Sequence, residues 1–290
     1  MAELIVERRA GVAVLTLARP KRLNAVTPGL VEELHTALDA LTADTATRIV
    51  ILTGQGRAFC AGMDIKGGDP GREAARPPDG TTAVGEMPET EPETQPGTEP
   101  EGRTQQIYRG IARGGEVVAR LREIPQPVIA ALHGPVVGMG ISLALACDLR
   151  VADPSTRFVA PFLNIGLSGG DVGLSWLLPR VVGPGRAAEI LYRAQTLSAS
   201  RAYELGMLTE VTGENGDLAA ALKLADELLA KSPYGLRHTK ELLNLSLDGP
   251  TLRQHLAVES RTQTMAFFTE DLAEGTAAAV EKRTPRFRDR

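Results

Sequence analysis

The pattern of apolar and polar positions in the first part of the chain predicts a hairpin, a helix and a buried strand. Residues 4–8 and 12–17 are alternating or β-branched runs separated by a glycine-containing turn, which is typical of a β-hairpin. After a Thr-Pro pair, leucine and valine recur at helical spacing over 28–42. Residues 48–53 then form a buried strand. Strand, helix and strand in this order predict a right-handed βαβ unit.

A second buried strand, 127–132, leads into the glycine-rich start of a helix. Gly138 and Gly140 flank Met139, and the apolar run 141–146 suits a core helix. The N–H groups at a helix start lack partners within the helix and carry the positive end of its dipole. Glycine lets a ligand approach the backbone closely. We therefore expect this junction to stabilise negative charge.

Residues 67–104 differ from the rest of the chain. They hold seven prolines and seven glutamates but almost no large apolar side chain, so they cannot bury enough surface to fold alone. We predict a disordered insertion, with a functional lid as the alternative.

The second half of the chain changes from short strands to helices. Strand candidates at 149–152 and 157–160 are followed by a nearly all-helical pattern, with helices expected at 184–193, 199–205, 216–231, 233–247 and, with at least one break, 250–282. This order predicts an α/β core over 1–200 and an α-helical extension over 201–290.

Charge and composition exclude several classes of function. The 290-residue chain has a net charge of −4 and a pI near 5.7, which gives no signal for nucleic acid or for an anionic membrane. Cys60 and Cys147 lie in apolar segments without metal-ligand spacing. The N-terminus lacks the order of a signal peptide, and no apolar stretch is long enough to span a membrane. We expect a cytoplasmic protein without a metal.

A second loop, 59–64, resembles the first junction because it also follows a buried strand and contains an Ala-Gly pair. One backbone N–H from each could converge on a single oxygen. Here the chain resembles the crotonase (enoyl-CoA hydratase/isomerase) superfamily over almost its whole length. The segments that carry the resemblance are, in order, ARPKRLNAV (18–26), FCAGMDIK (59–66), PVIAALHGPVVGMGISLALACDLRVAD (127–153), IGLSGGDVGLSWLLPRVVG (165–183) and EKRTPRF (281–287).

The resemblance implies a spiral of ββα repeats with a C-terminal α-helical trimerisation region, assembled as a homotrimer or a dimer of trimers. It implies an acyl-CoA thioester as substrate, with coenzyme A entering only as part of it and no separate cofactor. The backbone N–H groups of Met63 and Met139 would form an oxyanion hole for the thioester oxygen. The residues expected to bind coenzyme A are Lys21, Arg22, Ala25, Ala61, Asp64, Ile65 and Gly138.

The chain departs from the hydratases of this family at both catalytic glutamates. Ser142 and Phe162 stand at those positions, and neither side chain has a pKa suited to activating water or protonating carbon. We expect both, with Trp176, to line the acyl pocket. Asp171 is the remaining acid, and its position resembles an aspartate of dienoyl-CoA isomerases and 4-chlorobenzoyl-CoA dehalogenases. The resemblance thus implies enoyl-CoA isomerisation or atypical hydration, with Asp171 as acid/base.

Three alternatives remain open. Asp171 would also serve as the N-cap of a helix over 171–178. A catalytically silent relative would bind acyl-CoA without turning it over, which the loss of both glutamates supports. A hydrolase or dehalogenase would use Asp171 as a nucleophile.

Overall fold

A main sheet of six strands and a smaller one of three lie within residues 2–64 and 102–290, the parts of the chain that the computed structural model describes. The order in the main sheet is β1-β2-β3-β4-β6-β9, with β1 antiparallel to β2 and the other neighbours parallel. Its strands are β1 (Leu4–Arg9), β2 (Val12–Leu17), β3 (Ile49–Gly54), β4 (Val128–Leu132), β6 (Leu149–Ala152) and β9 (Glu210–Val211). The smaller sheet contains β5 (Pro135–Val137), β7 (Arg157–Val159) and β8 (Leu197–Ser198).

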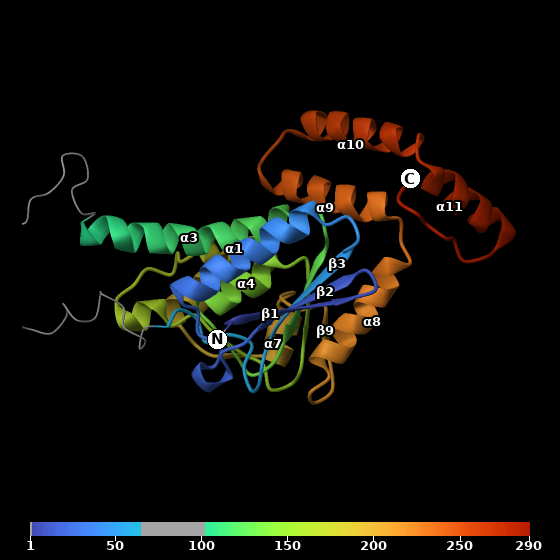
Figure 1. Ribbon diagram of the computed structural model, residues 1–290. Helices are drawn as coiled ribbons and strands as arrows, with labels where there is room; N and C mark the ends of the chain where they lie inside the picture. Colours follow the sequence, from blue (N-terminus) through green and yellow to red (C-terminus); the bar gives the residue numbers. More distant parts are fainter. Residues whose placement is uncertain (1, 65–101) are drawn as a thin grey trace, which may run out of the picture.

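The helices cover both faces of the main sheet (Figure 1). They are α1 (Pro28–Ala43), α3 (Arg103–Glu123), α4 (Met139–Ala146), α5 (Leu174–Val182), α6 (Pro184–Arg193), α7 (Ala199–Glu204), α8 (Asp217–Leu229), α9 (Pro233–Leu247), α10 (Leu252–Ala266) and α11 (Glu270–Glu281), with short 3₁₀ turns at Pro20–Arg22 and Phe162–Ile165. Helices α1, α3 and α4 lie together on one side, whereas α10 and α11 extend beyond the core. Among these described helices, none is long and apolar enough to cross a membrane.

The central strands are apolar at every position because both of their faces are covered. In β3, Val50 and Leu52 belong to the core shared with α1 and α3, whereas Ile49 and Ile51 pack with α8 on the opposite face. An uninterrupted apolar run is the expected signature of such a strand. The predicted hairpin and the βαβ unit β2-α1-β3 are confirmed.

The end of the predicted insertion differs from the structure. Residues 67–101 of the predicted insertion lie outside the described residues, and α3 already begins at Arg103. The division at residue 200 stays a prediction, although β9 pairs with β6 and α8 packs under the sheet after it. The expected break within 250–282 lies between α10 and α11.

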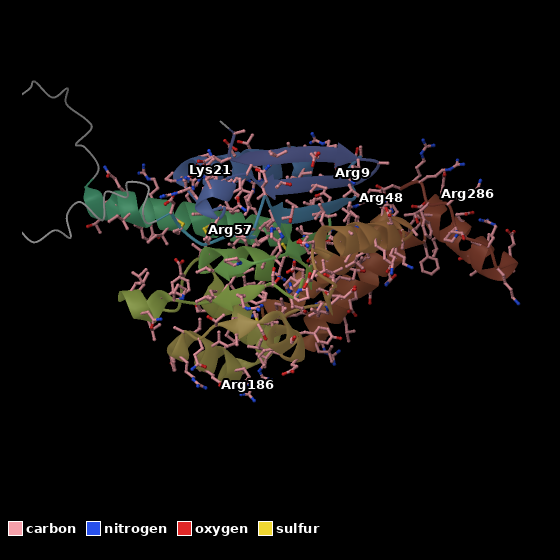
Figure 2. All side chains as sticks on the ribbon, turned by 90° about the horizontal axis from the view of Figure 1, so that it is seen from below. Arg9, Lys21, Arg48, Arg57, Arg186 and Arg286 are labelled. Atoms are coloured by element: carbon pink, nitrogen blue, oxygen red, sulfur yellow. The ribbon has the colours of Figure 1, made fainter. Side chains whose placement is uncertain are left out.

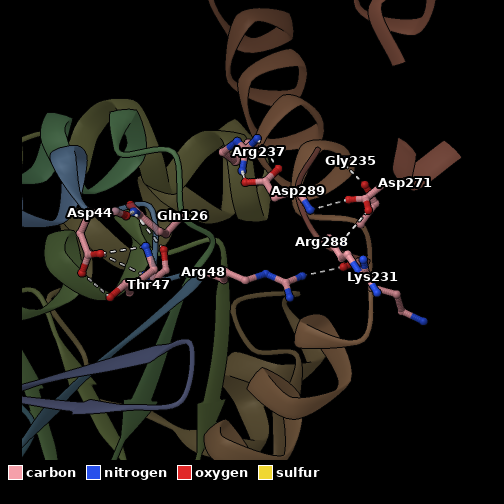
Figure 3. A network of polar contacts seen from close by, with 12 residues as sticks. Asp44, Thr47, Arg48, Gln126, Lys231, Gly235, Arg237, Asp271, Arg288 and Asp289 are labelled. Carbon is pink, nitrogen blue, oxygen red and sulfur yellow. Dashed lines mark hydrogen bonds and ion pairs between the residues drawn. The ribbon is translucent and has the colours of Figure 1, made fainter. Parts of the chain in front are cut away.

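Polar contacts near α9 hold the C-terminal residues and, separately, the residue before β3 (Figure 3). The Arg48 Nη2 donates to the Lys231 carbonyl at 2.6 Å. On α9, Arg237 makes two hydrogen bonds to Asp289, at 2.7 and 2.8 Å. The Asp271 carboxylate accepts the backbone N–H groups of residues 288 and 289. These contacts fix the chain end against α9 and α11, and Arg48 fixes the start of the segment that leads into α9.

Lys240 of α9 is a buried cation that joins three parts of the core. Its Nζ lies 3.0 Å from Asp148 Oδ2 and donates to the carbonyls of Leu121 and Gln126 at 3.0 and 2.9 Å. Burial lowers the pKa of Lys240, against the opposing charge of Asp148. The side chain therefore connects α9 to the end of α3 and to the loop after α4.

We expect Lys240→Met to lower the free energy of unfolding by about 3–5 kcal/mol, because it leaves a largely buried acceptor set without its cation. Urea unfolding followed by circular dichroism measures the change. Lys223→Met, on the exposed side of α8, is the matched control and should stay within about 0.5 kcal/mol of the wild type. Equal effects of the two changes would contradict this role of Lys240.

Candidate active site

Two loops meet at the carboxyl ends of the parallel strands. Cys60 pairs with Val136 as an isolated parallel bridge, with the Cys60 N–H donating to the Pro135 carbonyl at 3.1 Å. A Cβ added to Gly62 would lie 2.9 Å from the Val137 carbonyl oxygen and 3.7 Å from the Gly138 Cα. The loops therefore touch through their glycines.

The residues that follow these glycines carry the two predicted donors. Gly62 has a φ of +85°, and Gly138 has a φ of +54° and a ψ of −118°, a conformation that L side chains rarely adopt. Within the described residues, the backbone N–H groups of Met63 and Met139 donate no hydrogen bond. The structure thus brings together two neighbouring loops that each present an unused donor.

The loop 18–26 supports the Met63 loop from the other side. The Val26 N–H donates to the Gly62 carbonyl at 2.8 Å, and the Asp64 N–H donates to the Val26 carbonyl at 2.9 Å. Asn24 is fully buried, and its side-chain amide donates to the carbonyls of Gln55 and Ala58. Asn24 lies inside the ARPKRLNAV segment, but its role in holding the loop was not predicted.

The predicted coenzyme A residues have different surroundings. The Asp64 carboxylate is nearly buried and accepts hydrogen bonds from Arg19 and Arg22 at 2.9 Å each. Lys21 is exposed and makes no ion pair with a described residue. Figure 2 shows Lys21 at the opposite end of the sheet from Arg48. Of this group, Lys21 is exposed to solvent, while Asp64 is held by the two arginines.

The other members of the group belong to the backbone of the same loops. Ala61 donates its N–H to the Leu23 carbonyl at 2.9 Å, and Ala25 donates to the Arg22 carbonyl at 3.0 Å. Ile65 lies outside the described residues. Arg19 was missed by the sequence analysis, although the charged stretch after β2 contains it.

Ser142 and Phe162 lie next to this junction. The Phe162 ring is within 3.7 Å of the position of a Cβ on Gly138, and only 5% of Phe162 is exposed. Ser142 is fully buried on α4, and its hydroxyl donates to the Asp171 backbone carbonyl at 3.4 Å. An apolar ring therefore lies beside the donor loop, at the position where the resemblance implies a glutamate in the hydratases.

Trp176 is held by two cations. The Arg180 guanidinium carbon lies 3.7 Å from the ring centroid, and that of Arg122 lies 5.9 Å away. Such cation–π contacts stabilise the packing of an aromatic ring. Arg180 covers one face of the ring, so an acyl chain could contact Trp176 only through the other face or the ring edge. The predicted place of Trp176 in the acyl pocket stays a prediction.

Asp171 is half-buried on the loop before α5. Burial raises the pKa of its carboxyl above the ordinary value, against the opposing effect of the Val172 N–H. Helix α5 begins at Leu174 with Gly173 at its N-cap position, so Asp171 does not cap the helix that was expected to start there. Val172 has a φ of +34°, a strained value for a β-branched residue.

His133 and Cys60 are two further titratable residues close to the junction. The His133 ring contacts the Asp217 carboxylate at 2.8 Å. Burial raises the pKa of the Cys60 thiol to about 12, so the thiol stays protonated near neutral pH. Glu116, an acidic residue of α3, is exposed to solvent rather than buried beside the two loops.

Comparison with known proteins decides the family. Residues 7–78 and 98–290 match the enoyl-CoA hydratase/isomerase family. The chain belongs to this family. It is 36% identical to the probable enoyl-CoA hydratase echA12 of Mycobacterium leprae over 95% of this chain and 86% of that protein. It is 34% identical to the 1,2-epoxyphenylacetyl-CoA isomerase of Escherichia coli, over 96% and 95% of the two chains.

The fold of this crotonase also agrees with solved structures. An enoyl-CoA hydratase from Bacillus anthracis superposes with a TM-score of 0.84 at 28% identity and covers 100% of both chains. The expected crotonase-type α/β fold is confirmed. The chain is therefore an enzyme of the hydratase/isomerase type, and its substrates are acyl-CoA thioesters.

We expect Asp171→Asn to stabilise this crotonase at pH 7. The native pKa of Asp171 is raised, so the native state binds this proton more tightly than the unfolded chain does. Its contribution to stability is therefore present below the ordinary pKa of 3.8 and is lost as pH rises through the native value.

Urea unfolding of the two proteins at pH 7 and near pH 3.5 measures this difference. The stability advantage of the asparagine variant should shrink at the lower pH. Asp248→Asn, at an exposed aspartate, is the matched control and should show no such trend. An advantage that is unchanged by pH would argue against burial as its cause.

Proposed function

We propose that this crotonase isomerises the double bond of an enoyl-CoA, with Asp171 as acid/base. The observation that carries the proposal is the half-buried Asp171 carboxyl, with its raised pKa, on a loop hydrogen-bonded to the donor helix α4. A group whose pKa is raised toward neutral pH is suited to both removing and returning a proton. The alternative reaction at the same site is an atypical hydration of an enoyl-CoA.

The proposed reaction needs two parts of the site. As a carboxylate, Asp171 takes a proton from carbon, and the electron pair of that C–H bond moves onto the thioester oxygen as a dienolate. The Met63 and Met139 N–H groups stabilise the charge on this oxygen, an interaction whose loss typically costs about 10²–10³ in rate. The proton then returns from Asp171 to a different carbon, which leaves the double bond shifted.

Phe162 favours isomerisation over ordinary hydration. Its buried ring next to Gly138 provides neither an acid nor a base for activating water. An apolar wall also excludes water from the dienolate, which prevents side reactions. The Escherichia coli relative is named 1,2-epoxyphenylacetyl-CoA isomerase, which supports isomerisation of a CoA thioester, though of an epoxide, as a reaction of the family.

We expect Asp171→Asn to lower turnover of an enoyl-CoA by about 10² or more while acyl-CoA affinity stays similar, because the amide cannot accept the proton. A panel of enoyl, dienoyl and haloacyl thioesters, analysed by mass spectrometry, identifies the reaction, and calorimetry measures binding.

The same panel separates the alternatives. Intact turnover in the asparagine variant would overturn the role of Asp171. Tight acyl-CoA binding without any product from the wild type would support a silent binding protein. A covalent acyl-aspartate trapped by rapid quench would support a hydrolase or dehalogenase that uses Asp171 as a nucleophile.

We also propose that coenzyme A enters only as part of the substrate, bound through the loops that contain Lys21, Arg22 and Ala61. No separate cofactor is required by the proposed proton transfer. A cytoplasmic location fits an acyl-CoA enzyme whose two cysteines, Cys60 and Cys147, are free thiols in the core.

Finally, we propose a homotrimer or a dimer of trimers formed through the C-terminal helices. Phe267 and Phe268, in the link between α10 and α11, and Val280 of α11 are 76%, 80% and 79% exposed. Helices α10 and α11 extend from the core in Figure 1. Clustered exposed apolar side chains of this size are typical of protein interfaces.

Replacing Phe267 and Phe268 together by aspartate should shift the protein to a lower mass in light scattering, because a charged interface core opposes association. Val6→Asp, at a 41% exposed position of β1, is the control and should keep the wild-type mass. A wild-type protein that is monomeric at micromolar concentration would contradict the assembly.

A further inference from the structure

Helix α4 carries both a donor residue and a contact to the loop of Asp171. Met139 is its first residue, and Ser142 follows three positions later, so the two lie on neighbouring parts of one helix face. Every residue of α4 is buried. A short helix packed on all sides is a rigid element, and groups attached to it keep a fixed separation.

The Ser142 hydroxyl reaches the loop of the proposed acid. It donates to the Asp171 backbone carbonyl at 3.4 Å, and the Leu174 N–H donates to the same oxygen at 2.9 Å. This carbonyl therefore links α4 to the first turn of α5. Ser142 touches the loop of Asp171 through the backbone, so it leaves the carboxyl available for chemistry.

The next residue of the loop is held in a strained conformation by the same packing. Val172 has a φ of +34°, and only 8% of the residue is exposed. A Cβ on Gly114 of α3 would lie 3.6 Å from Val172 Cγ1 and 3.5 Å from Met139 Cε. Val172 and Met139 therefore share the space beside Gly114, and such strain persists only where the surroundings over-determine the backbone.

We propose that Ser142 is a positioning residue that sets the Asp171 carboxyl at a fixed place relative to the Met139 N–H. This inference rests on the proposed function, in which Asp171 transfers the proton and Met139 binds the thioester oxygen. Where the hydratases of the family carry a catalytic glutamate, this chain carries Ser142, whose hydroxyl orients the acid on the neighbouring loop.

The test uses Ser142→Ala with 3-hexenoyl-CoA as the probe substrate. Because a misplacement of about 1 Å costs up to roughly 10²-fold in rate, kcat should fall by about ten- to a hundredfold while KM changes little. Helix propensity favours alanine, and Asp171 O keeps the Leu174 bond, so the variant should fold. Ser142→Cys, which keeps the volume but has a weaker donor, should lie between the two proteins.

Two readouts separate positioning from a merely structural role. In an Asp171→Asn background, Ser142→Ala should cause no further loss, because Ser142 acts through Asp171. The acidic limb of the pH–rate profile should move to lower pH in Ser142→Ala. Burial raises the pKa of the Asp171 carboxyl, and no side-chain charge among the described residues contributes to this shift. A loosened loop lets water reach the carboxyl, which lowers its pKa.

The control is Ser246→Ala, which removes an exposed hydroxyl donating to the Leu243 carbonyl at 2.7 Å and should keep full activity. Wild-type kcat in Ser142→Ala, or an equal loss in the Asp171→Asn background, would overturn the inference. If Asp171→Asn itself retains activity on 3-hexenoyl-CoA, the proposed function fails. A loss in Asp171→Asn combined with an unchanged Ser142→Ala refutes only the positioning role.

Discussion

The site depends on the contact between two glycines, Gly62 and Gly138. A side chain on Gly62 would collide with the Val137 carbonyl at 2.9 Å, and one on Gly140 would lie 2.6 Å from the Cys60 carbonyl. Only glycine at these positions lets two loops from separate strands approach so closely. Met63 and Met139 follow these glycines in the two loops, and their N–H groups are unused within the described residues.

The rest of the core keeps this contact in place. Parallel strands β3 and β4 end at the same edge of the sheet, so the loops that follow them start as neighbours. Asn24 and the Arg19–Asp64 ion pair brace the first loop, and α4 continues directly from the second. The second loop and the loop of Asp171 both contact α4, the former by leading into the helix and the latter through Ser142.

The strands, the amphipathic helix 28–42 and the glycine junctions were predictable from local pattern, because an apolar run or a helical stripe reports how a segment is buried. The domain division and the roles of individual site residues stay predictions. The chain offered no local sign that Arg19, Asn24 and Lys240 would be buried or braced, since a charged or amide residue is usually solvated. The carbonyls that accept from the Asn24 amide lie 31 and 34 residues away in the sequence. Asp64 lies 45 residues from Arg19, and Asp148 pairs with Lys240 from a still more distant segment.

The sequence by itself determined the family, the two glycine loops and the absence of both hydratase glutamates. Each of these is a property of a short segment or of an ordered set of segments. Only the tertiary structure decided that Asp171 is not a helix cap, that burial raises its pKa, and that Ser142 contacts its loop. Desolvation and contacts across 29 residues depend on how distant segments pack, and no local pattern records them.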